Sequence, residues 1–188
     1  MDTIRAVRRP PARRGALRRG VLAAALVAAV SLAASSGTGV RRTTLPLGHT
    51  LESPEAVVAA LLEALAAADA DRLQQLALSE DEFKNVVWPD LPSSRPEVAL
   101  PFHYAWGTLR QNSRASLAMT LRAHAGRQYS FERIERRGEV TRYPNFSVHR
   151  QVDVLVREGS SRQRQRLRLF GSLLERDGRW KIFSFVVD

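Results

Sequence analysis

The chain of 188 residues contains no cysteine, and lysine supplies only two of its 29 basic residues, Lys84 and Lys181. Without cysteine there is no disulfide, no thiolate metal site and no lipid-anchored cysteine. The four histidines, at positions 49, 103, 124 and 149, are scattered and follow no metal-binding spacing. We therefore expect no metal and no other cofactor.

Acidic residues are scarce near the N-terminus. Residues 1–36 hold seven arginines and one aspartate, so they contribute +6 of the formal net charge of +10. The isoelectric point of about 11.3 is thus mostly a property of this leader. A basic isoelectric point of this origin does not indicate a nucleic-acid partner, and we expect none.

An uncharged apolar run follows the basic residues of the leader. Residues 21–36 read VLAAALVAAVSLAASS and end in small side chains. This order is typical of a secretory signal peptide, so we expect residues 1–36 to be cleaved and the mature chain to be periplasmic or secreted. Because no charge interrupts residues 21–40, an uncleaved membrane anchor there is the main alternative, and a disordered basic tail is another.

Residues 37–52 are predicted to be a linker, and residues 53–188 a single domain. The domain begins with helical signals, because serine or aspartate caps precede apolar residues at helical spacing. We expect three short helices, a proline-rich loop over residues 89–100, and a longer helix up to His124. The predicted helix starts are Ser53-Pro54, Asp69, the capping box of Ser79 and Glu82, and Pro101.

From Tyr129 onward, apolar residues alternate with a period of two, which indicates strands. The connections are short and contain glycine, so the strands should form an antiparallel meander. Helices followed by a continuous sheet make an α+β fold. The expected strands are residues 129–136, 146–157, 164–176 and 179–187.

The last two strands carry the clearest signal. Asp177-Gly178 tolerates positive φ at both positions, which predicts a two-residue hairpin turn. This turn pairs Leu173 with Ile182 and places Gly171 opposite Ser184. Side-chain alternation then gives two largely apolar faces, and we expect both to be covered.

The short paired helices from Ser53, the third helix and a curved meander ending in GSLLERDGRWKIFSF resemble the nuclear transport factor 2-like, or ketosteroid isomerase-like, superfamily. The resemblance covers residues 53–188 and is most specific in the closing hairpin. It implies a cystatin-like cone, in which N-terminal helices pack on a curved four-stranded antiparallel meander and enclose a pocket. Dimers through the convex face are frequent in this superfamily. Its members include isomerases, hydrolases and dehydratases as well as binding domains, so the fold leaves the function open.

Gly171 and Ser184 are the first candidates for ligand binding. If their face is the concave one, the missing side chain of Gly171 leaves a notch that a ligand could approach. A glycine within a strand also eases curvature, and this alternative stays open.

Three further residues complete the candidate ligand site. Arg150 shares the inward parity of the valines in its strand, so it could bind a ligand carboxylate, pair with a helix acid or lie at the rim. Tyr104 and Trp106 lie near the start of the long helix, where aromatic rings line a pocket mouth or simply pack in the core.

No catalytic residue is predicted. His149 and Asp153 have same-face spacing in one strand, but the valines of that strand should face inward and turn the pair outward. Enzymes of the similar superfamily often carry an acid at a pocket-facing strand position, and here those positions are mostly valine and leucine. Only a helix acid, Glu63 or Asp81, could still supply one.

Aromatic residues of the closing hairpin suggest an interface. Phe170, Phe183 and Phe185 share the outer face by parity, so we expect a homodimer or a protein partner there. The arginines at positions 162, 164, 166 and 168 alternate along one strand and predict a solvated edge.

These patterns favour an exported, non-catalytic domain that binds a small apolar or amphipathic ligand, or a protein partner. The alternative is a small acid–base enzyme of isomerase, hydrolase or dehydratase type, with Arg150 orienting an apolar substrate in the cone. An inward carboxylate or histidine within hydrogen-bond reach of the ligand would distinguish the enzyme. Membrane contact is expected only through an uncleaved N-terminal segment.

Overall fold

The computed structural model describes residues 46–98, 100–161 and 163–186. All of them belong to a compact unit that spans residues 42–188. The predicted signal peptide and the alternative anchor at residues 21–40 lie outside the described residues. Residues 46–52, the described part of the predicted linker, pack on the domain, since Leu51 and Trp180 exchange backbone hydrogen bonds of 2.9 and 2.8 Å.

The helices begin where the capping residues predict. The side chain of Ser53 accepts a hydrogen bond from the Ala56 amide, and both bonds of the predicted capping box between Ser79 and Glu82 are present. The third helix continues through a π-helical turn at Phe83–Val87 and 3-10 turns at Trp88–Asp90 and Pro92–Ser94. The α-helices are α1 (Pro54–Ala66), α2 (Ala70–Gln75), α3 (Glu80–Glu82) and α4 (Phe102–His124).

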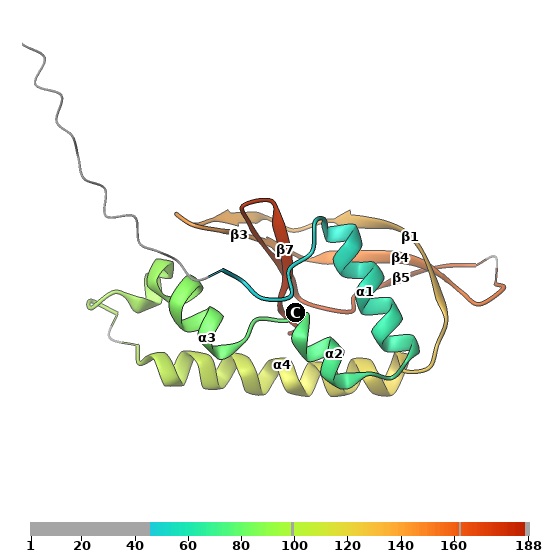
Figure 1. Cartoon of the computed structure of the whole chain (residues 1–188), viewed down its shortest axis with the longest axis horizontal. Coiled ribbons are helices and arrows are strands. Elements are labelled where there is room, and N and C mark those ends of the chain that lie inside the picture. The colour runs from blue at the N-terminus through green and yellow to red at the C-terminus, as the bar shows by residue number, and fades with distance from the viewer. Residues whose placement is uncertain (1–45, 99, 162, 187–188) are drawn as a thin grey trace, which may run out of the picture. The chain divides into compact units, whose positions relative to one another are not determined.

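The second half of the domain consists of strands, which confirms the α+β class. In Figure 1, α4 runs along the lower edge with α2 and α3 next to it, and the strands occupy the upper half. The strands are β1 (Tyr129–Arg136), β2 (Val140–Arg142), β3 (Ser147–Arg150), β4 (Val152–Glu158), β5 (Arg164–Leu167), β6 (Ser172–Arg176) and β7 (Arg179–Ser184).

The strands form two antiparallel sheets, of order β1-β4-β5 and β2-β3-β6-β7, where a single meander was expected. The predicted strand 146–157 is divided at Gln151, whose φ of 49° interrupts the ladder. As a result β3 joins one sheet and β4 the other. The predicted strand 164–176 is also divided, because residues 168–171 separate β5 from β6.

The hairpin of β6 and β7 has the predicted turn but not the full predicted register. Asp177 and Gly178 have φ values of 52° and 71°, and Leu173 lies opposite Ile182 as expected. Beyond this pair the register shifts, so that Ser184 lies opposite Ser172 and Phe183 is skipped. This β-bulge reverses the expected facing of the last residues.

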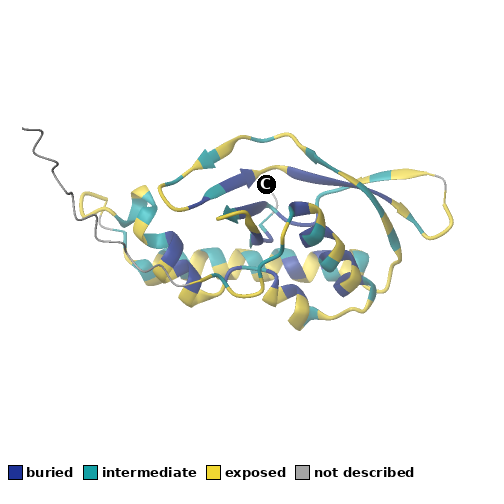
Figure 2. Cartoon of the chain, turned by 45° about the horizontal axis from the view of Figure 1, so that its top comes forward, coloured by how far each residue is buried: buried dark blue, intermediate teal, exposed yellow. Residues whose placement is uncertain are grey.

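Two apolar clusters cover the two faces of β6. Leu173 belongs to one cluster and Leu174 to the other, because neighbouring side chains of a strand point in opposite directions. Figure 2 shows the buried positions along the inner sides of the helices and strands. The α1 core contains mainly residues of α1, β4 and the closing hairpin, including Val57, Leu61, Leu65, Val154, Phe170, Leu173 and Ile182. The α3 core contains Leu78, Phe83, Val87, Phe146, Val148 and Leu174.

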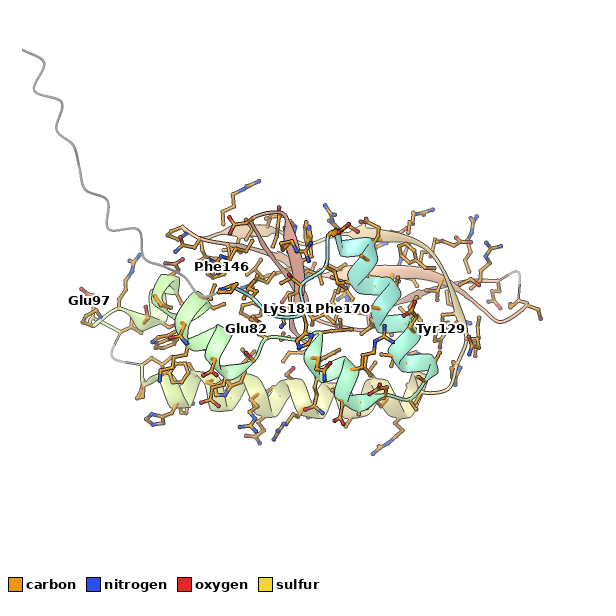
Figure 3. All side chains as sticks on the ribbon, in the orientation of Figure 1. Glu82, Glu97, Tyr129, Phe146, Phe170 and Lys181 are labelled. Carbon is orange, nitrogen blue, oxygen red and sulfur yellow. The ribbon has the colours of Figure 1, made fainter. Side chains whose placement is uncertain are left out.

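A buried ion pair joins α3 to β7. The Lys181 ammonium lies 2.9 Å from Glu82 Oε1 and donates a 2.7 Å hydrogen bond to the Gly48 carbonyl oxygen. Figure 3 shows the two labelled side chains next to each other. Burial by itself would raise the pKa of Glu82, but hydrogen bonds from the Ser79 amide and Lys181 outweigh it and hold that pKa below its usual value. The ionised carboxylate therefore stabilises the junction of α3, β7 and the segment before α1.

Candidate functional site

The candidate site is a cavity of about 280 Å³ beside α4. One wall is the side of α4 from Trp106 to Leu117, and another is the end of β7. The third wall is the segment that leads from α2 into α3. Pockets that bury drug-sized ligands measure roughly 300–1,000 Å³, so this cavity suits a small ligand.

Apolar side chains form one part of the cavity lining. Trp106, Leu109 and Leu117 line it from α4 at helical spacing, which places them on one side of that helix. Phe183 of β7 and Phe185, which follows β7, also line it.

The rim of the cavity is cationic. Arg110 and Arg114 lie one turn apart on α4 and are both exposed. Neither forms an ion pair with any residue that the structure describes. The sequence of α4 contains no acidic residue at all. The two guanidinium groups therefore keep their hydrogen-bond donors for a ligand.

Four other polar side chains line the cavity, those of Gln74, Ser79, Glu80 and Ser113. Ser113 Oγ accepts a 3.0 Å hydrogen bond from the Phe185 amide, so its hydroxyl hydrogen stays available to a second acceptor. Gln74, Ser79 and Glu80 line the cavity from α2 and the start of α3, and all three are exposed. Trp106 Nε1 is buried and has no hydrogen-bond partner among the described residues.

The predicted notch at Gly171 does not exist. A Cβ atom on Gly171 would overlap the carbonyl oxygen of Val186, so the chain itself fills the space that the glycine leaves. The Gly171 amide donates a 3.0 Å hydrogen bond to the Ser184 carbonyl oxygen, and Ser184 is buried. Gly171 permits a close approach of two backbones, and neither residue lines the cavity.

Of the other candidate ligand residues, only Trp106 lies at the cavity. Tyr104 is 62% exposed and points away from the core, because it lies two residues before Trp106 on the helix. Arg150 is exposed at the end of β3, where the bend at Gln151 ends the alternation that predicted an inward position.

The predicted interface residues do not share one exposed face. Phe170 and Phe185 are 0% and 1% exposed within the chain itself, so they offer no surface to a partner. Phe183 is partly buried and packs against the α3 core. A homodimer stays a prediction, but these rings do not provide its surface.

His149 and Asp153 are both buried, and they do not form a pair. His149 Nε2 lies 2.8 Å from Glu175 Oε2, whereas Asp153 pairs with Arg168 at 2.8 Å. The bend at Gln151 separates the two residues into different sheets. The predicted outward position is therefore wrong for His149, which lies against the Trp180 ring at 4.7 Å between centroids.

Sequence reasoning missed Arg110, Ser113 and Arg114. A signal was available, because Trp106, Leu109, Ser113 and Leu117 follow the i, i+3, i+4 spacing of one helix side. The two arginines flank that stripe on a helix without acids. The pattern does not give the distance between this helix and β7.

Within the described residues, no cluster of three or more histidine, aspartate or glutamate side chains could hold a metal ion. None of the described helices combines the length and apolar character needed to cross a membrane. No family model, curated protein or solved structure matches the chain.

Proposed function

We propose that this domain is an exported, non-catalytic binding domain, whose ligand is a small amphipathic molecule with one anionic group. The observation that carries the proposal is a cavity that combines aromatic and leucine side chains with two arginines that have no acidic partner among the described residues. The apolar part of the ligand occupies the space between Trp106 and Phe185, and its anionic group lies at the rim.

The arginine spacing supports this arrangement. Side chains at i and i+4 of a helix lie about 5–6 Å apart, so the guanidinium groups of Arg110 and Arg114 can both reach one carboxylate. Hydrogen bonds to charged groups contribute about 1.5–3 kcal/mol each, more than bonds between neutral groups. A carboxylate therefore gains more at this rim than a hydroxyl group of the same size.

The composition of the lining supports binding without catalysis. Among the described lining residues there is no histidine, and the one carboxylate, Glu80, is exposed at the start of α3. The acid–base enzyme requires an acid or base that faces the apolar part of the ligand. The described lining offers no such group, so binding is the function that it favours.

A matched pair of probes tests the proposal. We expect octanoate to bind the full chain about tenfold more tightly than octan-1-ol, since only octanoate engages the arginines. In Arg110→Gln/Arg114→Gln this preference is lost, while octan-1-ol binding is unchanged. Isothermal titration calorimetry measures both ligands.

The control variant is Arg72→Gln/Arg122→Gln, which removes the same charge from α2 and from the far end of α4. It should bind both probes as the natural chain does. Equal affinity of the natural chain for the two probes, or an equal loss in the control variant, would contradict the proposal.

A further inference from the structure

The outer face of the sheet β1-β4-β5 is rich in arginine. Val152, Val154 and Val156 of β4 belong to the α1 core, so the alternate residues Asp153 and Arg157 point to the opposite face. The cross-strand register places arginines of β1 and β5 beside them. We call this surface the arginine face; it comprises Arg133, Arg137, Arg157, Arg164, Arg166 and Arg168 together with Glu132, Glu135 and Asp153.

The carboxylates of the arginine face lie beneath its arginines. Each carboxylate contacts at least two guanidinium groups; Glu132, for example, lies 2.8 Å from Arg157 and 2.9 Å from Arg164. The side chains of the three acids are only 6–19% exposed, whereas five of the six arginine side chains are 47–65% exposed. The outermost layer of this face is therefore cationic.

The guanidinium groups are held in place and still have donors to offer. An arginine carries five N–H donors, and the contacts to the buried acids use one or two of them. Because the acids already restrict the arginine side chains, binding an anion costs less conformational entropy than on flexible side chains. Six arginines and three acids leave a net charge of +3 on one sheet face.

The absence of stacking groups narrows the class of partner. The aromatic residues of the three strands, Tyr129 and Phe131, pack against the α1 core. Single-stranded nucleic acid requires exposed aromatic rings among the basic residues, and the described part of this face offers none. A sheet surface that carries six guanidinium groups matches a flat array of phosphates.

We propose that the arginine face binds the surface of a phospholipid bilayer that contains anionic lipids. Arginine pairs with phosphate through parallel hydrogen bonds, and each basic residue near an anionic bilayer contributes about 1 kcal/mol of attraction. The alternative of an uncleaved anchor at residues 21–40 agrees with this partner, because only residues 41–45 would then separate the anchor from the described domain. Five extended residues reach roughly 17 Å, so such a domain would stay close to the bilayer. This inference is independent of the cavity ligand.

A fluorescent label on each of two surfaces tests the proposal, since the chain has no cysteine of its own. Ser130→Cys places the label on the arginine face, opposite Arg157, and Thr108→Cys places it on the exposed side of α4. The full chain is mixed with vesicles of phosphatidylcholine and phosphatidylglycerol in equal parts, which carry a quencher on some lipid headgroups. We expect several-fold stronger quenching of the label at position 130 than of the label at position 108.

The stronger quenching at position 130 must depend on the charge of the arginine face. It should disappear in vesicles of phosphatidylcholine alone and at about 1 M salt, where the screening length is roughly 3 Å. Arg164→Gln/Arg166→Gln should require roughly tenfold more lipid for half-maximal quenching, because it removes two charges but leaves each acid with at least one arginine. Arg72→Gln/Arg122→Gln should behave as the natural chain. Equal quenching at the two positions, no quenching at either, or an unaffected Arg164/Arg166 variant would overturn the proposal.

Discussion

The helices α1 and α4 both cover strands, but they are buried to very different degrees. Seven of the 13 residues of α1 are buried, whereas only Leu117 and Thr120 are buried among the 23 residues of α4. The sequences explain the difference. Alanine, valine and leucine make up most of α1, whereas α4 interrupts its apolar side with arginine, glutamine, asparagine and serine.

This difference separates a helix that builds the core from a helix that borders a cavity. The α1 core is closed, with several side chains that have no exposed surface. Along α4 the contact is partial, and the space that remains is lined by Trp106 and bordered by two arginines. The more loosely packed side of the domain is thus the one equipped for a ligand.

The largest effect on stability is expected at the buried ion pair that joins α3 to β7. Because the ion pair of Glu82 and Lys181 is buried, Glu82→Ala leaves an uncompensated charge and should lower the free energy of unfolding by about 3–5 kcal/mol. The double variant Glu82→Gln/Lys181→Met removes both charges and should lose much less. Urea unfolding measures all three chains.

The same ion pair makes the free energy of unfolding depend on pH. Because the folded chain holds the pKa of Glu82 below its usual value, the stabilisation is present above that value and is lost as the pH falls through the folded pKa. The double variant should lack this acid-side loss. If it loses stability in acid as steeply as the natural chain, Glu82 is not the responsible group.

A pair of leucine variants tests the comparison of the two helices directly. Leu61 of α1 is fully buried, so Leu61→Ala should lower the free energy of unfolding by about 2–5 kcal/mol. Leu109 of α4 borders the cavity and is partly exposed, so Leu109→Ala should cost less than about 1 kcal/mol. Thermal and urea unfolding provide the values. Equal losses would show that α4 contributes to the core as α1 does.

Local signals made part of this fold predictable. A serine before a proline started α1, and Asp177-Gly178 formed its turn, because each feature depends only on neighbouring residues. The α+β class followed from the order of the helical and alternating patterns.

The register beyond Leu173 was not predictable in the same way. It depends on the approach of the Val186 backbone to Gly171, two segments that meet only after the hairpin has formed. A glycine in a strand is compatible with a notch, a bend or a close approach, and parity alone does not choose between them. The facing of the phenylalanines of the closing hairpin was misassigned for a related reason, since the bulge at Phe183 changes the register of the two strands.

The cavity was hardest to foresee, although four of its lining residues were visible as a stripe along α4. Periodicity identifies which side of a helix faces inward, but it does not give the distance to the opposite strand. That distance depends on how the α3 core and the segment after α2 pack between them.

The most direct test of the ligand cavity is the set of indole N–H signals in a nitrogen-15 NMR spectrum of the full chain. The chain has three tryptophans, of which Trp106 lines the cavity and Trp180 belongs to the α1 core; Trp106→Phe identifies the signal of Trp106. Octanoate should shift the Trp106 signal in a saturable way and leave that of Trp180 in place. At the same concentration it should have little effect on Arg110→Gln/Arg114→Gln. A Trp106 signal that does not move, or that moves no more than that of Trp180, would contradict a ligand site beside α4.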